Sequence, residues 1–94
     1  MDYDWDPDKA IANINKHGVS FEEAKTVFDN PLAVIFSDEI NSVGEQREII
    51  VGHSANNLLL MVSFTERPDT VRLISARLVT PKRSEEHTSE TPVT

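Results

Sequence analysis

The arginines of this 94-residue chain are the side chains best suited to chemistry. All five lie in its second half, at Arg47, Arg67, Arg72, Arg77 and Arg83. Arginine binds phosphate through two parallel hydrogen bonds and stays charged at every relevant pH. The alternative is a structural role, in which strand arginines lie over apolar neighbours and discourage edge-to-edge aggregation. Their concentration in one half of the chain favours a phosphate-binding site.

Two short segments carry groups that could transfer protons. Lys16 and His17 precede Gly18 at the expected end of a helix, where His17 could move a proton beside a cation. The alternative is that both side chains only complement the negative end of the helix dipole. Glu45 and Arg47 stand at the expected start of a strand, either as an acid–base or phosphate-reading pair or as a solvated ion pair. Spacing alone leaves both alternatives open.

The charge is divided unevenly along the chain. The net charge is −7; residues 1–46 carry ten acidic and three basic side chains, whereas residues 47–94 carry six of each. Indiscriminate nucleic-acid binding relies on a long-range basic field, so the overall acidity argues against it. A compact arginine-lined site on an acidic body remains compatible with this distribution.

Several kinds of site are not expected. The chain has no cysteine, which excludes disulfides and thiolate sites, and its three histidines have no neighbouring ligands at metal spacing. We therefore expect neither a metal nor a cofactor. The longest apolar run, residues 58–62, is too short to span a bilayer, and residues 1–9 carry four aspartates where a signal peptide needs basic groups. The expectation is a cytoplasmic protein without membrane contact.

The first third of the chain predicts a short strand and two helices. Alternating aromatics predict the strand at residues 3–5. Asp6-Pro7-Asp8 is typical of a helix start, and Gly18 of its end. The expected inward stripe of this helix is Ala10, Ile11 and Ile14. A second helix is expected from the capping box at residues 20–23 to the stop at residues 29–31, with an apolar stripe of Phe21, Ala24, Val27 and Phe28.

The remainder predicts an antiparallel sheet of about four strands. The hydrophobic period changes to two, with strands expected at 32–37, 47–53, 58–65 and 71–79 and turns at 54–57 and 67–69. The fold class is therefore α+β, with one domain over residues 1–80. Residues 81–94 hold one apolar side chain, Val93, and are expected to be a disordered tail. Simple alternation puts Arg72 and Arg77 on opposite sheet faces unless a bulge intervenes.

The chain resembles the BrnT toxins over about residues 3–80, because several sequence blocks occur in the same order. These blocks are residues 5–7, 9–10, 13 with 16–24, 27–32, 42–47 and 65–67 with 72–77. The resemblance implies a RelE-like fold and a ribonuclease toxin of a bacterial type II toxin–antitoxin module. It also implies a BrnA antitoxin of the ribbon-helix-helix type, which binds DNA, so that this chain would contact DNA only through its partner.

The resemblance leads to a hypothesis of metal-independent RNA cleavage. It assigns Arg47, Arg72 and Arg77 to the scissile phosphate and proton transfer to His17 or Glu45. Lys16 and Arg67 would contact the substrate backbone. The RNA would be single-stranded or presented by the ribosome, because A-form grooves hide the base edges.

The chain departs from the family pattern after residue 80. BrnT chains usually continue into a basic helix there, whereas this chain has Pro81-Lys82-Arg83 followed by the acidic segment 84–90. The alternative function is therefore a catalytically degenerate module that binds an antitoxin and does not cleave RNA. A third possibility is a regulatory domain that binds a small anionic ligand at the arginines.

Overall fold

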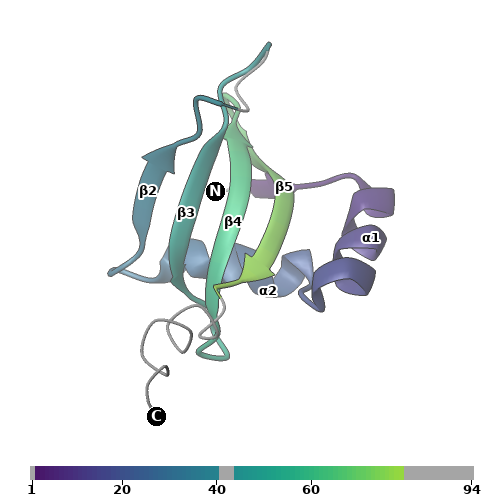
Figure 1. Cartoon of the computed structure of the whole chain (residues 1–94). Coiled ribbons are helices and arrows are strands. Elements are labelled where there is room, and N and C mark those ends of the chain that lie inside the picture. The colour runs from purple at the N-terminus through teal and green to yellow at the C-terminus, as the bar shows by residue number, and fades with distance from the viewer. Residues whose placement is uncertain (1, 41–43, 80–94) are drawn as a thin grey trace.

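A five-stranded sheet forms the centre of the molecule (Figure 1). The computed structural model describes residues 2–40 and 44–79. In chain order the elements are β1 (Asp2–Asp4), α1 (Pro7–His17), α2 (Phe21–Lys25), the 3₁₀ helix η1 (Thr26–Asp29), β2 (Val34–Ser37), β3 (Glu48–His53), β4 (Leu59–Glu66) and β5 (Thr70–Leu78). The strand order is β1-β5-β4-β3-β2, antiparallel except that β1 runs parallel to β5. The expected α+β class is confirmed; the proposed tail at 81–94 lies outside the described residues.

The helix ends follow from local sequence. The Asp6 carboxylate accepts a hydrogen bond from the Asp8 N–H at 2.8 Å, and Pro7 occupies the first turn. Gly18 ends α1 with φ +71°, a conformation that favours glycine, and its N–H donates to the Ile14 carbonyl at 2.8 Å. The Ser20 hydroxyl accepts from the Glu23 N–H at 3.0 Å and starts α2. The expected second helix continues to Asp29, but its last turn is the 3₁₀ helix η1.

The inward face of α1 differs from the expected apolar stripe. Ile11 and Ile14 are 61% and 49% exposed, and the side chain that the helix buries is Asn13. The reason is that α1 lies beside β5 at one side of the sheet, so only a narrow face meets the protein (Figure 1). That face carries Ala10, Asn13 and His17, which share one side of a helix because they lie three and four residues apart.

The hydrophobic core lies between the sheet and the segment 19–28. This segment contributes Val19, Phe21, Ala24 and Val27; the sheet contributes Ile50, Leu60, Val62, Phe64, Val71, Leu73 and Ala76. Aromatic rings join the layers: Phe28 meets Phe64 edge to face at 5.0 Å between centroids, and Trp5 meets Phe21 at 5.7 Å. The helices therefore cover one face of the sheet, and the opposite face, here called the open face, carries none of these core side chains.

A bulge in β5 decides which arginines share a face. Ser63 pairs with Ser75, but the next residue of β4, Phe64, pairs with Leu73, so Ile74 is an extra residue in β5. Val71, Leu73 and Ala76 are all buried on the covered face despite their uneven spacing. Arg72 and Arg77, each next to one of these buried residues, consequently both lie on the open face. The bulge that the sequence required for Arg72 and Arg77 to share a face is therefore present.

Glu23 departs from the expected capping box. Its backbone N–H donates to the Ser20 hydroxyl as expected, but its carboxylate reaches the turn between β3 and β4. There it accepts hydrogen bonds from the Ser54 hydroxyl, from the Asn56 N–H at 3.3 Å and from the Asn56 amide at 2.5 Å. The hydrogen bond from Ser54, aided by those from Asn56, lowers the pKa of Glu23. The carboxylate thereby ties α2 to a turn about thirty residues away.

We expect Glu23→Gln to lower the melting temperature at neutral pH and to lose this effect in acid. Because the folded-state pKa lies below the unfolded value, the ionised carboxylate stabilises the fold above its ordinary pKa. That contribution disappears as the pH falls through the lowered pKa. Thermal unfolding followed over pH 2–7 (roughly the carboxylate range) measures the difference. Glu22→Gln, which removes an exposed carboxylate near Lys25, is the matched control; parallel curves for the two variants would contradict the expectation.

Gly52 leaves room for no side chain. A Cβ atom at this position would lie 2.7 Å from the Ala33 Cβ and 3.2 Å from the Val27 Cγ1. We expect Gly52→Ala to destabilise the protein by about 1–3 kcal/mol through overpacking. Denaturant unfolding measures the loss, and the double variant Gly52→Ala with Ala33→Gly should recover part of it. Unchanged stability of Gly52→Ala would contradict the expectation, because it would show that Ala33 and Val27 move away from β3 at no cost in free energy.

Candidate active site

Three neighbouring cross-strand rows of the open face surround the candidate site. The strand register gives Val34–Val51–Met61–Arg77 as one row and Phe36–Ile49–Ser63–Ser75 as the central row. The third row is Asp38–Arg47–Thr65–Arg72, where the Asp38 N–H donates to the Arg47 carbonyl at 2.9 Å. Neighbouring rows are about 7 Å apart, because two residues separate them along each strand. Because each row crosses four strands, it brings together side chains that are far apart in the sequence.

A hollow of about 440 Å³ lies over the central row. Its polar lining is Lys16, His17, Asp38, Ser63, Ser75 and Arg77, and its apolar lining is Ile49 and Met61. Lys16 and Arg77 outnumber the single carboxylate, Asp38, and give the hollow a positive balance on a chain whose net charge is −7. A hollow of this size and lining suits a small anionic group such as a phosphodiester.

Asn13 places the end of α1 against this hollow. Its side-chain amide donates to the carbonyls of Val19 and Ala76, both at 2.8 Å, and its side-chain oxygen accepts from the Ala76 N–H at 3.1 Å. Ala76 is the neighbour of Arg77, and His17 lies one helical turn beyond Asn13 on the same helix face. The three buried hydrogen bonds thus fix Lys16 and His17 beside Arg77.

Arg77 projects from β5 into the hollow. Its side chain is exposed, and one Nη2–H donates to the Met61 sulfur at 3.5 Å, across the β4–β5 pairing. Thioether sulfur is a weak acceptor, so this contact leaves most of the hydrogen-bonding capacity of the guanidinium available to a ligand. Arg77 is therefore well placed to bind an incoming phosphate.

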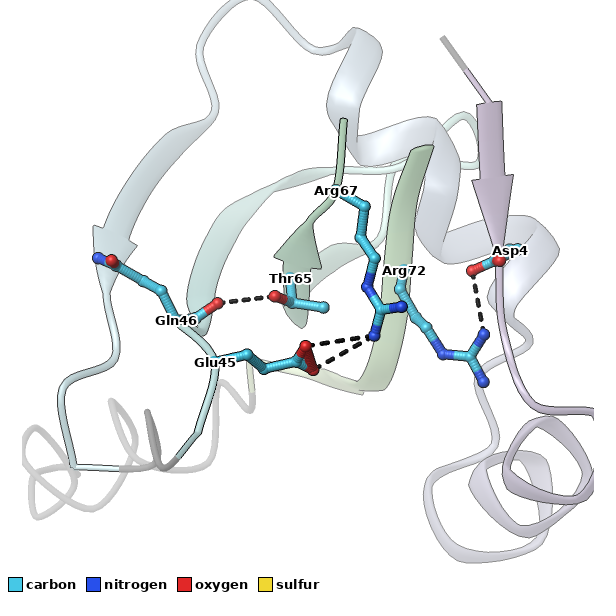
Figure 2. Close-up of polar contacts among 6 residues, drawn as sticks. All are labelled: Asp4, Glu45, Gln46, Thr65, Arg67 and Arg72. Carbon is cyan, nitrogen blue, oxygen red and sulfur yellow. Dashed lines mark hydrogen bonds and ion pairs between the residues drawn. The ribbon is translucent and has the colours of Figure 1, made fainter. Parts of the chain in front are cut away.

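Two ion pairs lie at the other end of the open face (Figure 2). Arg67 contacts Glu45 at 3.2 Å, and Arg72 contacts Asp4 of β1 at 3.4 Å. Beside them the Thr65 hydroxyl donates to the Gln46 carbonyl at 2.7 Å, which holds the segment before β3 on the sheet. All four charged side chains are at least one-third exposed, so each ion pair is weak. Each arginine can therefore exchange its carboxylate for another anionic partner.

The structure brings together some of the seven residues proposed from sequence and separates others. Lys16, His17 and Arg77 line one hollow. Arg47 and Arg72 belong to the adjacent row, whereas Glu45 and Arg67 pair with each other outside the hollow. A three-arginine clamp is thus not assembled within the hollow, because Arg72 lies five residues before Arg77 and turns to Asp4.

Sequence reasoning missed Asp38, Ser63 and Ser75 as parts of the hollow. Ser63 and Ser75 are directly paired across β4 and β5. Their signal was available, since each is a small polar residue flanked on both sides by apolar residues of its strand. Asp38 carried no such signal, because only the pairing of β2 with β3 places it here.

Within residues 2–40 and 44–79 no group of three or more His, Cys, Asp or Glu side chains could hold a metal ion. In the same ranges no helix has both the length and the apolar character required to cross a membrane.

Comparison with known proteins places this architecture in a family. A structural search matches the 1.1 Å crystal structure of the Brucella abortus ribonuclease toxin BrnT, with a TM-score of 0.66 and 23% identity. The match covers 85% of this chain and 97% of that chain, and it shows a shared fold. A search of curated proteins found no match. The model of the family described as "Ribonuclease toxin, BrnT, of type II toxin-antitoxin system" matches residues 5–83. The chain therefore belongs to the BrnT family of ribonuclease toxins of type II toxin–antitoxin systems.

Proposed function

We propose that this chain is a metal-independent endoribonuclease that cleaves single-stranded RNA in the hollow over the central row. The observation that carries the proposal is the meeting of His17 with Lys16 and Arg77 above the paired hydroxyls of Ser63 and Ser75. A proton-transfer group and two phosphate-binding cations are the elements that such a cleavage needs.

The proposed reaction uses these residues in the following way. The RNA 2′-oxygen attacks the adjacent phosphorus, the bond from phosphorus to the 5′-oxygen breaks, and a 2′,3′-cyclic phosphate forms. The 2′-hydroxyl loses a proton and the 5′-oxygen gains one, and His17 takes part in these proton transfers. Arg77 and Lys16 bind the phosphate oxygens and stabilise the charge that grows on them in the transition state.

The other residues have supporting roles in this proposal. Proton transfer is assigned to His17 rather than Glu45, because the Glu45 carboxylate pairs with Arg67 outside the hollow. Arg47 and Arg72 lie one row away, about 7 Å along the strands, and would bind the next phosphates of the RNA. Arg67 would join them by exchanging Glu45 for a phosphate.

The proposal includes a protein partner. Membership of a type II toxin–antitoxin family implies an antitoxin. We assign it to the BrnA-type ribbon-helix-helix class, with DNA contacted only through that protein and with the cytoplasm as the place of action. The acidic body of this chain suits a basic partner.

Cleavage of a labelled single-stranded RNA by the purified protein tests the proposal. We expect products ending in a 2′,3′-cyclic phosphate, unchanged yield with EDTA, and no cleavage of the same strand with a 2′-deoxy sugar at the cut position. Cleavage of the deoxy substrate would contradict 2′-oxygen attack, and loss of activity in EDTA would contradict independence of metal. Intact RNA together with capture of a ribbon-helix-helix protein encoded next to this gene would instead select the non-cleaving antitoxin-binding module.

A further inference from the structure

Phe36 is unlike the other aromatic residues of the chain. The chain has six aromatic residues, all within the part that the structure describes. Phe21 and Phe64 are buried, and Tyr3, Trp5 and Phe28 pack against the core through ring contacts of 5.0–5.7 Å. Phe36 is 53% exposed. The fold therefore leaves one aromatic ring at the surface.

The register places this ring beside the candidate active site. Phe36 pairs with Ile49, Ile49 with Ser63 and Ser63 with Ser75, so Phe36 is the β2 end of the central row. Ile49, its direct neighbour, lines the hollow. Three strand spacings separate the Cα atoms of Phe36 and Ser75, a distance of about 14 Å. Phe36 itself lines an adjoining apolar cavity with Val34, Val51 and Leu59, where a nucleotide next to one bound in the hollow could lie.

We propose that Phe36 is the stacking platform for a base that flanks the scissile phosphate. This inference rests on the proposed ribonuclease function and adds to it how the strand is held. Basic side chains bind the RNA backbone without holding a base, whereas an exposed ring stacks on the π-face of any base. Single-stranded RNA can be bound in this way because its bases are unpaired and can unstack from one another.

Ile35, the neighbour of Phe36 in β2, distinguishes base stacking from the docking of a protein chain along the sheet edge. β2 is the edge strand of the sheet, and Ile35 is exposed to the same extent as Phe36, 53%. Ile35 pairs with Ile50, whose side chain is buried on the covered face, so Ile35 points away from the open face. A chain added along the β2 edge would contact both side chains, whereas a base over the open face contacts Phe36.

Binding of a short, fluorescein-labelled 2′-O-methyl RNA tests the inference, because blocked 2′-hydroxyls prevent cleavage. We expect Phe36→Ala to weaken binding by about 5- to 150-fold, the range of base–aromatic stacking. Phe36→Leu, which keeps apolar bulk but lacks a π-face, should also weaken it with an unchanged melting temperature. Phe36→Trp should restore binding, with its indole fluorescence quenched on RNA addition, and Ile35→Ala should bind as the wild type does. With cleavable RNA the loss in Phe36→Ala should fall mainly on KM.

The outcomes separate failure of this inference from failure of the proposed function. Wild-type protein that neither binds nor cleaves RNA refutes the proposed function before any variant is compared. Wild-type protein that cleaves RNA while Phe36→Leu binds it equally well overturns the stacking role alone. Equal losses in Phe36→Ala and Ile35→Ala also overturn it, since they point to the edge strand rather than to the ring.

Discussion

Arg77→Ala is expected to slow RNA cleavage by about 10²–10³-fold, the typical loss of one donor to transition-state charge. Arg77 lines the hollow together with Lys16 and His17. Its guanidinium donates a hydrogen bond to the Met61 sulfur, which is a weak acceptor. Since the side chain is exposed, its removal should leave the melting temperature nearly unchanged. Single-turnover cleavage of a labelled RNA measures the rate.

Arg72→Ala is the matched control for this prediction. Arg72 lies on the same strand and the same face, but it pairs with Asp4 and belongs to the adjacent row. We expect a smaller loss of rate that is strongest at low substrate concentration, because a backbone contact supports binding rather than the transition state. Equal rates for Arg77→Ala and the wild type, or a larger loss in Arg72→Ala, would move the cleavage centre to the other end of the open face.

Asn13→Ala is expected to destabilise the protein by about 2–4 kcal/mol, because it leaves buried backbone groups without hydrogen-bond partners. These groups are the Val19 carbonyl and both the carbonyl and the N–H of Ala76. The same change frees the end of α1 from β5, so cleavage should fall even at temperatures where the variant stays folded. Denaturant unfolding and single-turnover cleavage measure the two effects.

Asn15→Ala is the control, since Asn15 is an exposed asparagine two residues along the same helix. Alanine has the higher helix propensity, so this variant should be as stable as the wild type or slightly more stable. If Asn13→Ala unfolded at the same denaturant concentration as Asn15→Ala, the three buried hydrogen bonds would not be what fixes α1.

Local signals in the sequence predicted most elements. Asp6, Gly18 and Ser20 act within four residues of themselves, and each forms the expected cap. The period-two segments became β2 to β5 with bounds within two residues of those expected. The α+β class also follows from the order of the predicted helices and strands. The family follows from sequence blocks over about residues 3–80, and the family model matches residues 5–83.

The buried face of α1 could not be predicted from its own sequence. Ile11 and Ile14 form a good apolar stripe by spacing, yet the structure buries Asn13. Periodicity measures the stripe of one helix alone, whereas burial depends on what that helix meets. Here it meets the polar backbone of β5 at Ala76, which only a hydrogen-bonding side chain satisfies.

The sequence by itself determined the helices, the strands and the supply of arginines, because caps and periodicity depend on residues a few positions apart. The tertiary structure decided which of these side chains meet. Ile74 became a bulge because β4 and β5 pair on both sides of it, and this put Arg72 and Arg77 on one face. Lys16 and His17 joined Arg77 through hydrogen bonds from Asn13 to a residue 63 positions away. Pairings over such distances depend on the packing of the whole chain, which no local pattern records.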